Sequence, residues 1–295
     1  MSAAVTQKVR HQPGTMRDGR QRSWTSIIVM VLLALLWSVP TLALLVTSFR
    51  DRVDVASTGW WTVITNPFGQ NWTLGNYQGV FDGSSMGSGF LNSIVVAIPA
   101  TILPIMFAAF AAYAFTFMEF RGKEILFIAI VAVMVVPLQV ALQPMMNLMS
   151  DIGIGGQFVA VWLLHTGFGM PLCIYTLRNY MATLPVSVVE SAKIDGASHF
   201  QTFWKLIAPM STPAIAAFAT LQFLWVWNDL LIAKLFLVPS NSTVIVQLQQ
   251  LLGTQGQGKE LLTAGAFISM ALPILVFVFL QRFFVRGMTS GSVKG

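Results

Sequence analysis

Residues 88–118 read SGFLNSIVVAIPATILPIMFAAFAAYAFTFM, a run of 31 residues without any Asp, Glu, Lys or Arg. An α-helix needs about 20 apolar residues to cross the hydrocarbon core of a bilayer, so this run is long enough to span one. The rest of the chain has the same character, because 55% of its 295 residues are hydrophobic and 9% are charged. A soluble domain carries roughly 25% charged residues. The sequence therefore predicts an all-α membrane protein.

Further charge-free apolar runs predict the number of spans. Together with the first they lie at 23–49, 88–118, 125–150, 152–177, 206–228 and 261–281. We expect six transmembrane helices. The run at 23–49 exceeds the roughly 7–15 apolar residues of a signal peptide, so we retain it as a span. Two other charge-free runs, 55–81 and 235–258, are rich in Gly, Asn, Gln, Ser and Thr, and we expect external loops there.

The positions of Lys and Arg predict the orientation. With the N-terminus inside, inner segments hold thirteen of these residues and outer segments hold four. Cytoplasmic loops carry the excess of Lys and Arg, so both termini are expected in the cytoplasm. The expected organisation is a basic cytoplasmic tail at 1–22, a six-span domain at 23–284 with a cytoplasmic loop at 180–212, and a cytoplasmic tail at 285–295.

The cytoplasmic loop contains ESAKIDGASHFQTFWKLIAP at 190–209, which concentrates charge in a chain that has little. Pro185 suits the first turn of a helix, and Gly196 suits its left-handed stop. Ser198 followed by Gln201 is typical of a capping box, which predicts a second helix. That helix has one apolar face, formed by Phe200, Phe203, Trp204 and Ile207, and we expect it to end at Pro209.

This helix–turn–helix has two interpretations. An amphipathic loop lying on lipid headgroups would explain the aromatic face. A short first helix with few charges of both signs, joined to the second by a glycine, suits docking into a groove of a soluble partner better.

The same stretch resembles the EAA loop of ATP-binding-cassette (ABC) importer permeases, the coupling helix of that family. Three further stretches resemble the carbohydrate-uptake branch in the expected order: FLNSIVVA at 90–97, FLWVWND at 223–229 and RGMTSGSVKG at 286–295, the last similar to the tail of MalG-like subunits. Ser191 stands where the family often has Ala, and Ala208 stands where it has Leu.

The resemblance implies a MetI/MalG-like permease fold in a bacterial plasma (inner) membrane and a role as one membrane subunit of a sugar importer. The implied ATPase-coupling residues are Glu190, Ser191, Ala192, Asp195 and Gly196. The implied partners are a MalF-like second permease, two ATP-binding subunits that hold ATP and Mg²⁺, an extracytoplasmic sugar-binding protein docked on the loops at 50–87 and 237–260, membrane lipid and the sugar. Gly291–Gly295 would reach between the ATPase subunits. The implied mechanism is alternating access, and no nucleic acid, cofactor or enzymatic site is implied for this chain.

Two stretches resemble catalytic motifs. GTQGQGKE at 253–260 has the G-x-x-x-x-G-K spacing of a phosphate loop, but Glu260 replaces the hydroxyl that would hold Mg²⁺, so we expect a flexible outer loop. GSSMG at 83–87 has the serine-hydrolase spacing, but it lies at the outer start of a span, and we expect a glycine-rich helix entry. A single Cys173 in an apolar run excludes a disulfide framework and is expected to pack as an apolar residue.

Polar residues within spans are costly and are candidates for a substrate path. One set recurs every four residues on the third span: Gln139, Gln143 and Asn147. A second set lies on one expected face of the fifth span, with two neighbours beside it: Gln222, Trp225, Asp229, Trp227 and Asn228. Amides, carboxylates and aromatic faces suit a sugar, but hydrogen bonds between helices explain both sets equally well. Asn92 and His165 stand alone, and for them the structural explanation is preferred.

Three alternatives remain at this point. The solute is expected to be an oligosaccharide or an α-glucoside of the trehalose or maltose type, with glycerol 3-phosphate as a second candidate. An ion-coupled secondary transporter would need intramembrane acids, for which Asp229 is the candidate, and often an inverted repeat, which we do not find. An intramembrane hydrolase would need a reactive Ser85.

Overall fold

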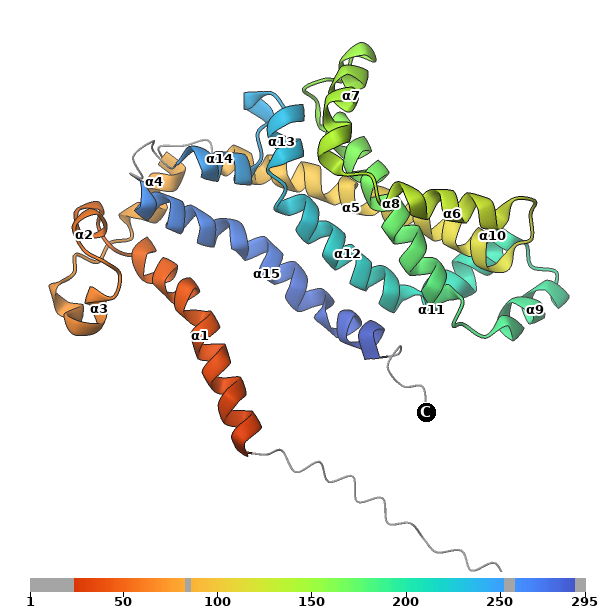
Figure 1. The fold of residues 1–295 in the computed structure, drawn as a ribbon, viewed down its shortest axis with the longest axis horizontal. Helices are drawn as coiled ribbons and strands as arrows, with labels where there is room; N and C mark the ends of the chain where they lie inside the picture. The colour runs from red at the N-terminus through yellow and green to blue at the C-terminus, as the bar shows by residue number, and fades with distance from the viewer. Residues whose placement is uncertain (1–23, 83–85, 252–257, 290–295) are drawn as a thin grey trace, which may run out of the picture. The chain divides into compact units, whose positions relative to one another are not determined.

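The computed structural model describes residues 24–82, 86–251 and 258–289, with side chains to residue 282 (Figure 1). The basic tail at 1–22 and the last residues of the C-terminal tail, 290–295, lie outside the described residues. Within the described ranges the chain forms helices, and the β-bridges there are isolated ones, Arg50 with Trp72 and Gly156 with Leu237. The predicted all-α class is confirmed.

Within the described residues, four helices are long and apolar enough to cross a membrane: α1 (Trp24–Ser48), α5 (Met86–Phe117), α8 (Phe158–Met181) and the Lys259–Arg282 part of α15 (Lys259–Thr289). Two bent pairs meet the same criterion together. They are α6 (Lys123–Val133) with α7 (Leu138–Asp151), and the helical run His199–Met210 with α12 (Thr212–Trp227). The six predicted spans correspond to these four helices and two bent pairs.

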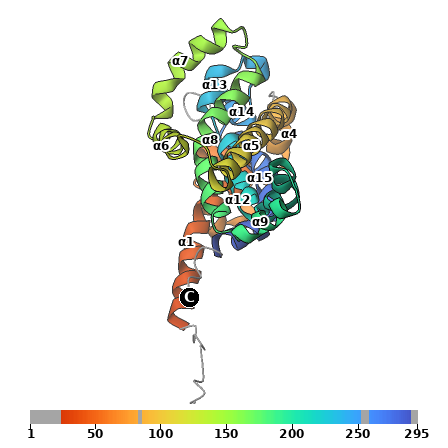
Figure 2. The same cartoon turned by 90° about the vertical axis from the view of Figure 1, so that its right-hand side faces the viewer.

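The third predicted span is not one straight helix. Its two parts, α6 and α7, meet at an angle of 97° (Figure 2). Pro137 lacks a backbone N–H and disfavours helical geometry at the residue before it, which explains a break there. The turn Met134–Val136 and the extended Pro137 occupy the bend. Consequently α7 leaves the direction of α6 instead of continuing it.

The fifth predicted span bends by 73° at Ser211. The expectation that Pro209 ends the preceding helix is wrong, because α10 (His199–Thr202), the π-helical turn η2 (Phe203–Ile207) and α11 (Ala208–Met210) follow one another without a break. A proline ring clashes with the carbonyl four residues earlier. That residue, Lys205, lies in the wider π-helical turn, which makes room for the ring.

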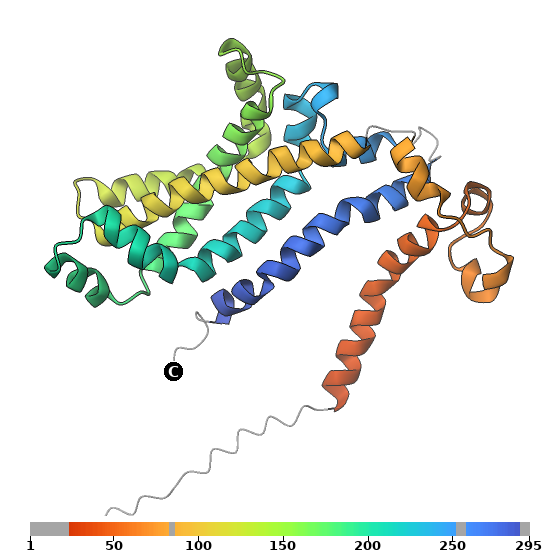
Figure 3. The ribbon, with the colours of Figure 1, turned by 180° about the vertical axis from the view of Figure 1, so that it is seen from behind.

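Two apolar clusters form the core of the unit from Leu44 onward. Helix α5 packs along α8, where small buried residues of α5 such as Ala108 and Ala112 face Cys173 and Leu177. Small side chains allow such close helix approach in membranes. Helix α12 packs against both α5 and α15, and the three run side by side in Figure 3. Cys173 is buried, as expected for an apolar packing role.

The other unit ends at Ala43 and consists, in its described part, of most of α1. Large apolar side chains of α1 are exposed all round the helix, including Trp24 at 79% and Trp37 at 79%. A helix that is hydrophobic on every side is typical of a membrane span.

The loops expected to be external contain short helices, and these are packed more closely than expected. They are α2 (Arg52–Ser57), α3 (Thr62–Thr65), η1 (Pro67–Gly69), α4 (Gly75–Asp82), α13 (Leu231–Phe236), η3 (Pro239–Asn241) and α14 (Val244–Gln250). Val244 is fully buried against α5, and the Oγ of Ser93 accepts a hydrogen bond from its N–H at 2.8 Å. Asn92 donates to the carbonyls of Ser240 and Ser242, which confirms its structural role.

Candidate functional site

The loop between α8 and α12 folds as a helix, a glycine turn and a second helix. Pro185 precedes α9 (Val186–Ile194), and Gly196 adopts a positive φ of 77° after it. The N–H of Gly196 donates to the carbonyl of Lys193 at 3.1 Å, and the N–H of Ala197 donates to the carbonyl of Ala192 at 2.9 Å. These two bonds form a Schellman motif, which fixes the direction in which the chain leaves α9.

The second helix begins as the sequence predicts. Ser198 and Gln201 form the capping box, with the Ser198 hydroxyl accepting from the Gln201 N–H and the Gln201 side chain accepting from the Ser198 N–H. Because a left-handed stop is followed two residues later by a capped start, the angle between α9 and α10 is set by local bonds.

Aromatic contacts join this loop to the end of α5. The ring of Phe110 lies 4.5 Å from that of Phe203 and 5.7 Å from that of Trp204, measured between centroids. The hydroxyl of Tyr113 lies 3.0 Å from Nδ1 of His199. The second helix of the loop therefore packs on α5, and α5 in turn packs on α8 and α12.

The predicted coupling residues divide into two sets. Glu190, Ser191, Asp195 and Gly196 are exposed, and beside them Ile194 is 86% exposed. Ala192 is buried at 6% and lies on the inner side of α9, where it lines a groove between α9 and α10. The exposed set forms a surface of both charge and apolar character on a helix of nine residues.

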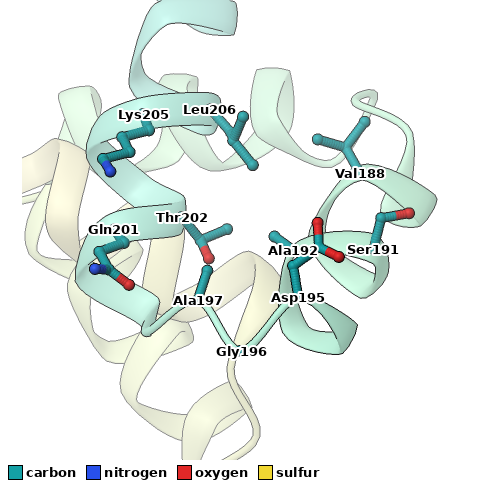
Figure 4. Close-up of a pocket in the computed structure, with 10 residues that line it drawn as sticks. All are labelled: Val188, Ser191, Ala192, Asp195, Gly196, Ala197, Gln201, Thr202, Lys205 and Leu206. Carbon is teal, nitrogen blue, oxygen red and sulfur yellow. The ribbon is translucent and has the colours of Figure 1, made fainter.

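A groove of about 670 Å³ separates α9 from α10 and η2 (Figure 4). Val188, Ser191 and Asp195 come from α9 and its end, and Thr202 and Leu206 come from the other side. The loop thus has a protruding helix and a concave side, which suits insertion into another protein better than lying flat on a membrane.

A second polar site gathers around His165, which is an isolated polar residue in the sequence of the fourth span. Gln222 donates to the carbonyl of Ala100 at 3.1 Å and to that of His165 at 3.4 Å. The His165 and Trp225 rings meet edge to face at 4.9 Å, and Nε2 of His165 lies 3.7 Å from a carboxylate oxygen of Asp229. Three of the predicted path residues therefore meet at His165: Trp225 and Asp229 at its buried imidazole, and Gln222 at its backbone carbonyl.

The predicted helical face explains only part of this convergence. Helix α12 ends at Trp227, so Asp229 lies beyond it and reaches His165 from the turn before α13. The same carboxylate accepts the N–H of Ala233 at 3.2 Å and so begins α13. Nδ1 of His165 is buried and has no hydrogen-bond partner among the described residues.

Trp227 and Asn228 do not join this site. Trp227 is 2% exposed, stacks on Phe223, and donates its indole N–H to the carbonyl of Ser269 on α15 at 3.2 Å. Asn228 donates to the carbonyl of Leu224, one turn back on its own helix. The burial of Trp227 and the hydrogen bond of Asn228 support the structural explanation for them.

The predicted polar stripe on α7 is exposed. Gln139, Gln143 and Asn147 all lie on the open side, and Gln143 donates to Asn147 at 3.2 Å. Leu142 and Met149 are buried on the opposite side. Two apolar cavities of about 270 Å³ and 180 Å³ lie between the α6–α7 bend and α8, and the second is lined in part by Trp225.

The structure does not support a catalytic role for either of the two stretches that resemble catalytic motifs. Residues 252–257 of GTQGQGKE, and residues 83–85 including Ser85, lie outside the described residues. Lys259 begins α15, and Glu260 is buried at 5%, in a helix that no strand precedes among the described residues. The described side chains contain no group of three His, Cys, Asp or Glu that could hold a metal ion.

Residues 105–290 match the sequence model of the binding-protein-dependent transport system inner membrane component family. The chain belongs to this family. The match begins within α5 and includes the α9–α10 loop, the His165 site and α15, so both candidate sites lie in the family's shared region.

Curated relatives cover almost the whole permease. It is 51% identical to the osmoprotective compounds uptake permease protein GgtD of Synechocystis sp., over 90% of this chain and 91% of that protein. It is 36% identical to the alpha-glucoside transport system permease protein AglG of Rhizobium meliloti, over 92% and 97%. It is 35% identical to the trehalose transport system permease protein SugB of Mycobacterium tuberculosis, over 76% and 82%.

A solved structure shares the fold. A chain of a bacterial ABC transporter involved in the import of the acidic polysaccharide alginate superposes with a TM-score of 0.72 at 18% identity, covering 92% of this permease and 100% of that chain. The predicted family and permease fold are confirmed, and this assignment does not favour the ion-coupled transporter or the intramembrane hydrolase.

Proposed function

We propose that this permease forms one half of the membrane pathway of an ATP-driven importer for a neutral glucoside or small oligosaccharide. The named relatives act on osmoprotective compounds, alpha-glucosides and trehalose, which supports this class of solute. The residues that gather at His165 include no Lys or Arg, whereas an anionic solute such as glycerol 3-phosphate would call for a cation.

The observation that carries the proposal is the α9–Gly196–α10 loop. Local bonds hold its angle, Phe110 and Tyr113 connect it to α5, and Glu190 and Ile194 are exposed on its protruding helix. A rigid helix in a partner's groove transmits movement, whereas a flexible loop does not. ATP binding by two partner subunits would move α9, and α5, α8 and α12 would follow between two packed arrangements.

The proposed orientation places α9 in the cytoplasm and the end of the bundle with α4, α13 and α14 outside, in keeping with the excess of Lys and Arg on the inner side. At that outer end the sugar-binding protein would deliver its solute. A second permease of the MalF type would complete the pathway, because the α7 stripe and the α6–α7 bend are open in a single chain.

Within this half, the proposed path residues are Gln222, Trp225 and Asp229 around His165, with the α7 stripe as a second candidate lining. An aromatic face next to a carboxylate and an amide suits the C–H surface and the hydroxyl groups of a sugar. Trp227 is not proposed as a contact because it is buried and bonded to α15, and Asn228 is not proposed because its amide is bonded to the carbonyl of Leu224.

The proposal is tested in proteoliposomes by measuring uptake and the ATPase activity stimulated by loaded binding protein. Glu190→Lys should uncouple hydrolysis from uptake or prevent assembly with the ATPase subunits. Glu119→Lys reverses another exposed charge, in the turn between α5 and α6, and should leave both activities unchanged. Equal activities in the two variants would contradict the assignment of α9 as the coupling element.

For the path, Asp229→Ala should reduce uptake while the complex remains assembled. Wild-type uptake by the double variant Asp229→Ala with Gln222→Ala would remove this site from the pathway and leave the α7 stripe as the remaining candidate in this chain.

A further inference from the structure

Several large apolar side chains stand exposed between α2 and α4, and three of them lie on or beside α3 and η1. Neither the coupling loop nor the His165 site accounts for these three. Trp61 is 61% exposed, Ile64 is 75% exposed and Phe68 is 98% exposed. They are spaced three and four residues apart, with Trp61 directly before α3, Ile64 in α3 and Phe68 in η1. We call these three residues the aromatic tip. Exposed apolar groups of this size mark a contact with a membrane or with another protein.

The segment that carries the aromatic tip is cross-linked by hydrogen bonds. Arg50 is fully buried, and its guanidinium donates to the side chain of Gln70 at 2.9 Å, to the carbonyl of Asp54 at 3.1 Å and to the hydroxyl of Thr58. The carboxylate of Asp54 accepts the N–H of Asn71 at 2.6 Å. These bonds hold the two ends of the segment together, so the tip is presented from a fixed base.

That base lies at the end of a membrane span. Helix α1 ends at Ser48, and the next residues pair with the far side of the segment. The N–H of Asp51 donates to the carbonyl of Asn71 at 2.9 Å, and the N–H of Thr73 donates to the carbonyl of Phe49 at 2.8 Å. The side chain of Asn76 donates to the carbonyl of Ser48 at 2.9 Å. The segment is therefore fixed to the end of the apolar helix α1.

The composition of the segment suits lipid. Residues 55–81 contain no Asp, Glu, Lys or Arg, and the indole N–H of Trp72 is already bonded to the carbonyl of Pro67 at 3.0 Å. Tryptophan and other amphipathic aromatic residues concentrate at the headgroup level of membranes. A docking surface for a soluble protein would leave Phe68 in water whenever that protein is absent, whereas a lipid surface is always present at the end of a span.

We propose that the aromatic tip inserts into the headgroup region of the lipid leaflet at which α1 ends. The segment from Arg50 to Asn76 then acts as an interfacial foot that fixes the depth of the adjoining span ends. Helix α15 packs on α2 and α4, so the foot would also fix the depth of that span. This inference does not depend on the identity of the solute or on the coupling role of α9.

The test measures the depth of single bimane probes on the complete transporter in lipid nanodiscs. The native Cys173 is fully buried, so the parent protein serves as the unlabelled background. Phe68→Cys and Ile64→Cys carry the probe on the tip, and Ser57→Cys carries it on the exposed side of α2 as the matched control. All these positions are exposed, so labelling should not disturb folding.

Brominated phosphatidylcholine should quench the tip probes several-fold more than the Ser57 probe, and aqueous iodide should show the reverse order. Binding protein, loaded or empty, should change neither result. Equal iodide quenching at all positions would overturn the proposal. Protection of the tip that appears only with loaded binding protein would also overturn it and would assign the tip to that protein.

Discussion

The left-handed turn at Gly196 allows the coupling role of the α9–α10 loop to be tested by backbone strain alone. Gly196 has φ of 77°, and a Cβ atom placed there meets nothing within 4 Å. A side chain at this position therefore costs only the left-handed strain, which is roughly 1–2 kcal/mol for an L-residue. Such a cost changes the ratio of bent to unbent loop by a factor of about 5–30.

The chain offers a matched control at the end of α7. Gly153 has the same φ of 77°, and a Cβ atom at this position would likewise meet nothing within 4 Å. Its N–H donates to the carbonyl of Ser150 at 2.9 Å, and the N–H of Ile154 donates to that of Met149 at 2.9 Å, which is the hydrogen-bond pattern found at Gly196. Gly153→Ala and Gly196→Ala should therefore lower the stability of the permease by similar amounts.

The two variants should differ in coupling, measured as solute imported per ATP hydrolysed in proteoliposomes. Gly196→Ala should lower this ratio several-fold, and Gly196→Pro should abolish coupling or assembly, because proline fixes φ near −65°. Gly196→Asn should stay close to wild type, since asparagine tolerates the left-handed region. Gly153→Ala should keep the wild-type ratio. If Gly196→Ala and Gly153→Ala give the same ratio, or Gly196→Pro couples normally, the angle between α9 and α10 has no role in coupling.

Three further outcomes are expected. Trp225→Ala should reduce uptake with little change in thermal stability. Trp227→Ala should instead lower the melting temperature, because it empties a buried site and typically costs about 3–5 kcal/mol. The two variants are compared by uptake and by thermal unfolding of the purified complex. Gly169→Ala should lower stability and uptake together, because a Cβ there would lie 2.8 Å from the side-chain amide of Gln222 and displace it from its two carbonyl partners. Each of these hydrogen bonds is worth about 0.6 kcal/mol in a membrane. Unchanged thermal unfolding and uptake would contradict this prediction. Arg50→Met should make the segment between α1 and α4 sensitive to added protease, because several backbone and side-chain acceptors lose a buried donor. Protease resistance equal to wild type would show that Arg50 does not stabilise this segment.

Local chemistry explains which parts of the fold the sequence could predict. Charge-free runs place the spans because lipid excludes charge over a fixed thickness, and the α9–α10 turn follows from residues within a few positions of Gly196. The bend at Pro137 could have been predicted from the proline itself. The charge-free apolar run at 125–150 suggests one continuous helix instead. Proline and the restricted residue before it interrupt a helix however apolar its neighbours are.

The His165 site needed information that no local pattern contains. Successive residues of a helix differ by about 100° in direction, so Trp225 and Trp227 point to nearly opposite sides, and sequence spacing does not say which side faces α8. In the structure, the ring of Trp225 contacts that of His165, whereas Trp227 is hydrogen-bonded to α15. One signal was present, because an ionisable residue within a span calls for a named partner. Pairing His165 with Asp229, the acid at the end of the fifth span, would have indicated the site.

The position of Asp229 connects the two candidate sites. It lies where α12 ends, it begins α13 through the N–H of Ala233, and it faces His165 on α8. The other end of α12 follows the bend at Ser211, directly after the helical run that begins in the coupling loop. Because a helix moves nearly as a rigid body, a movement of α12 relative to α8 would change the distance between Asp229 and His165. The same helix therefore joins the element that would respond to ATP to the polar cluster that would meet the solute.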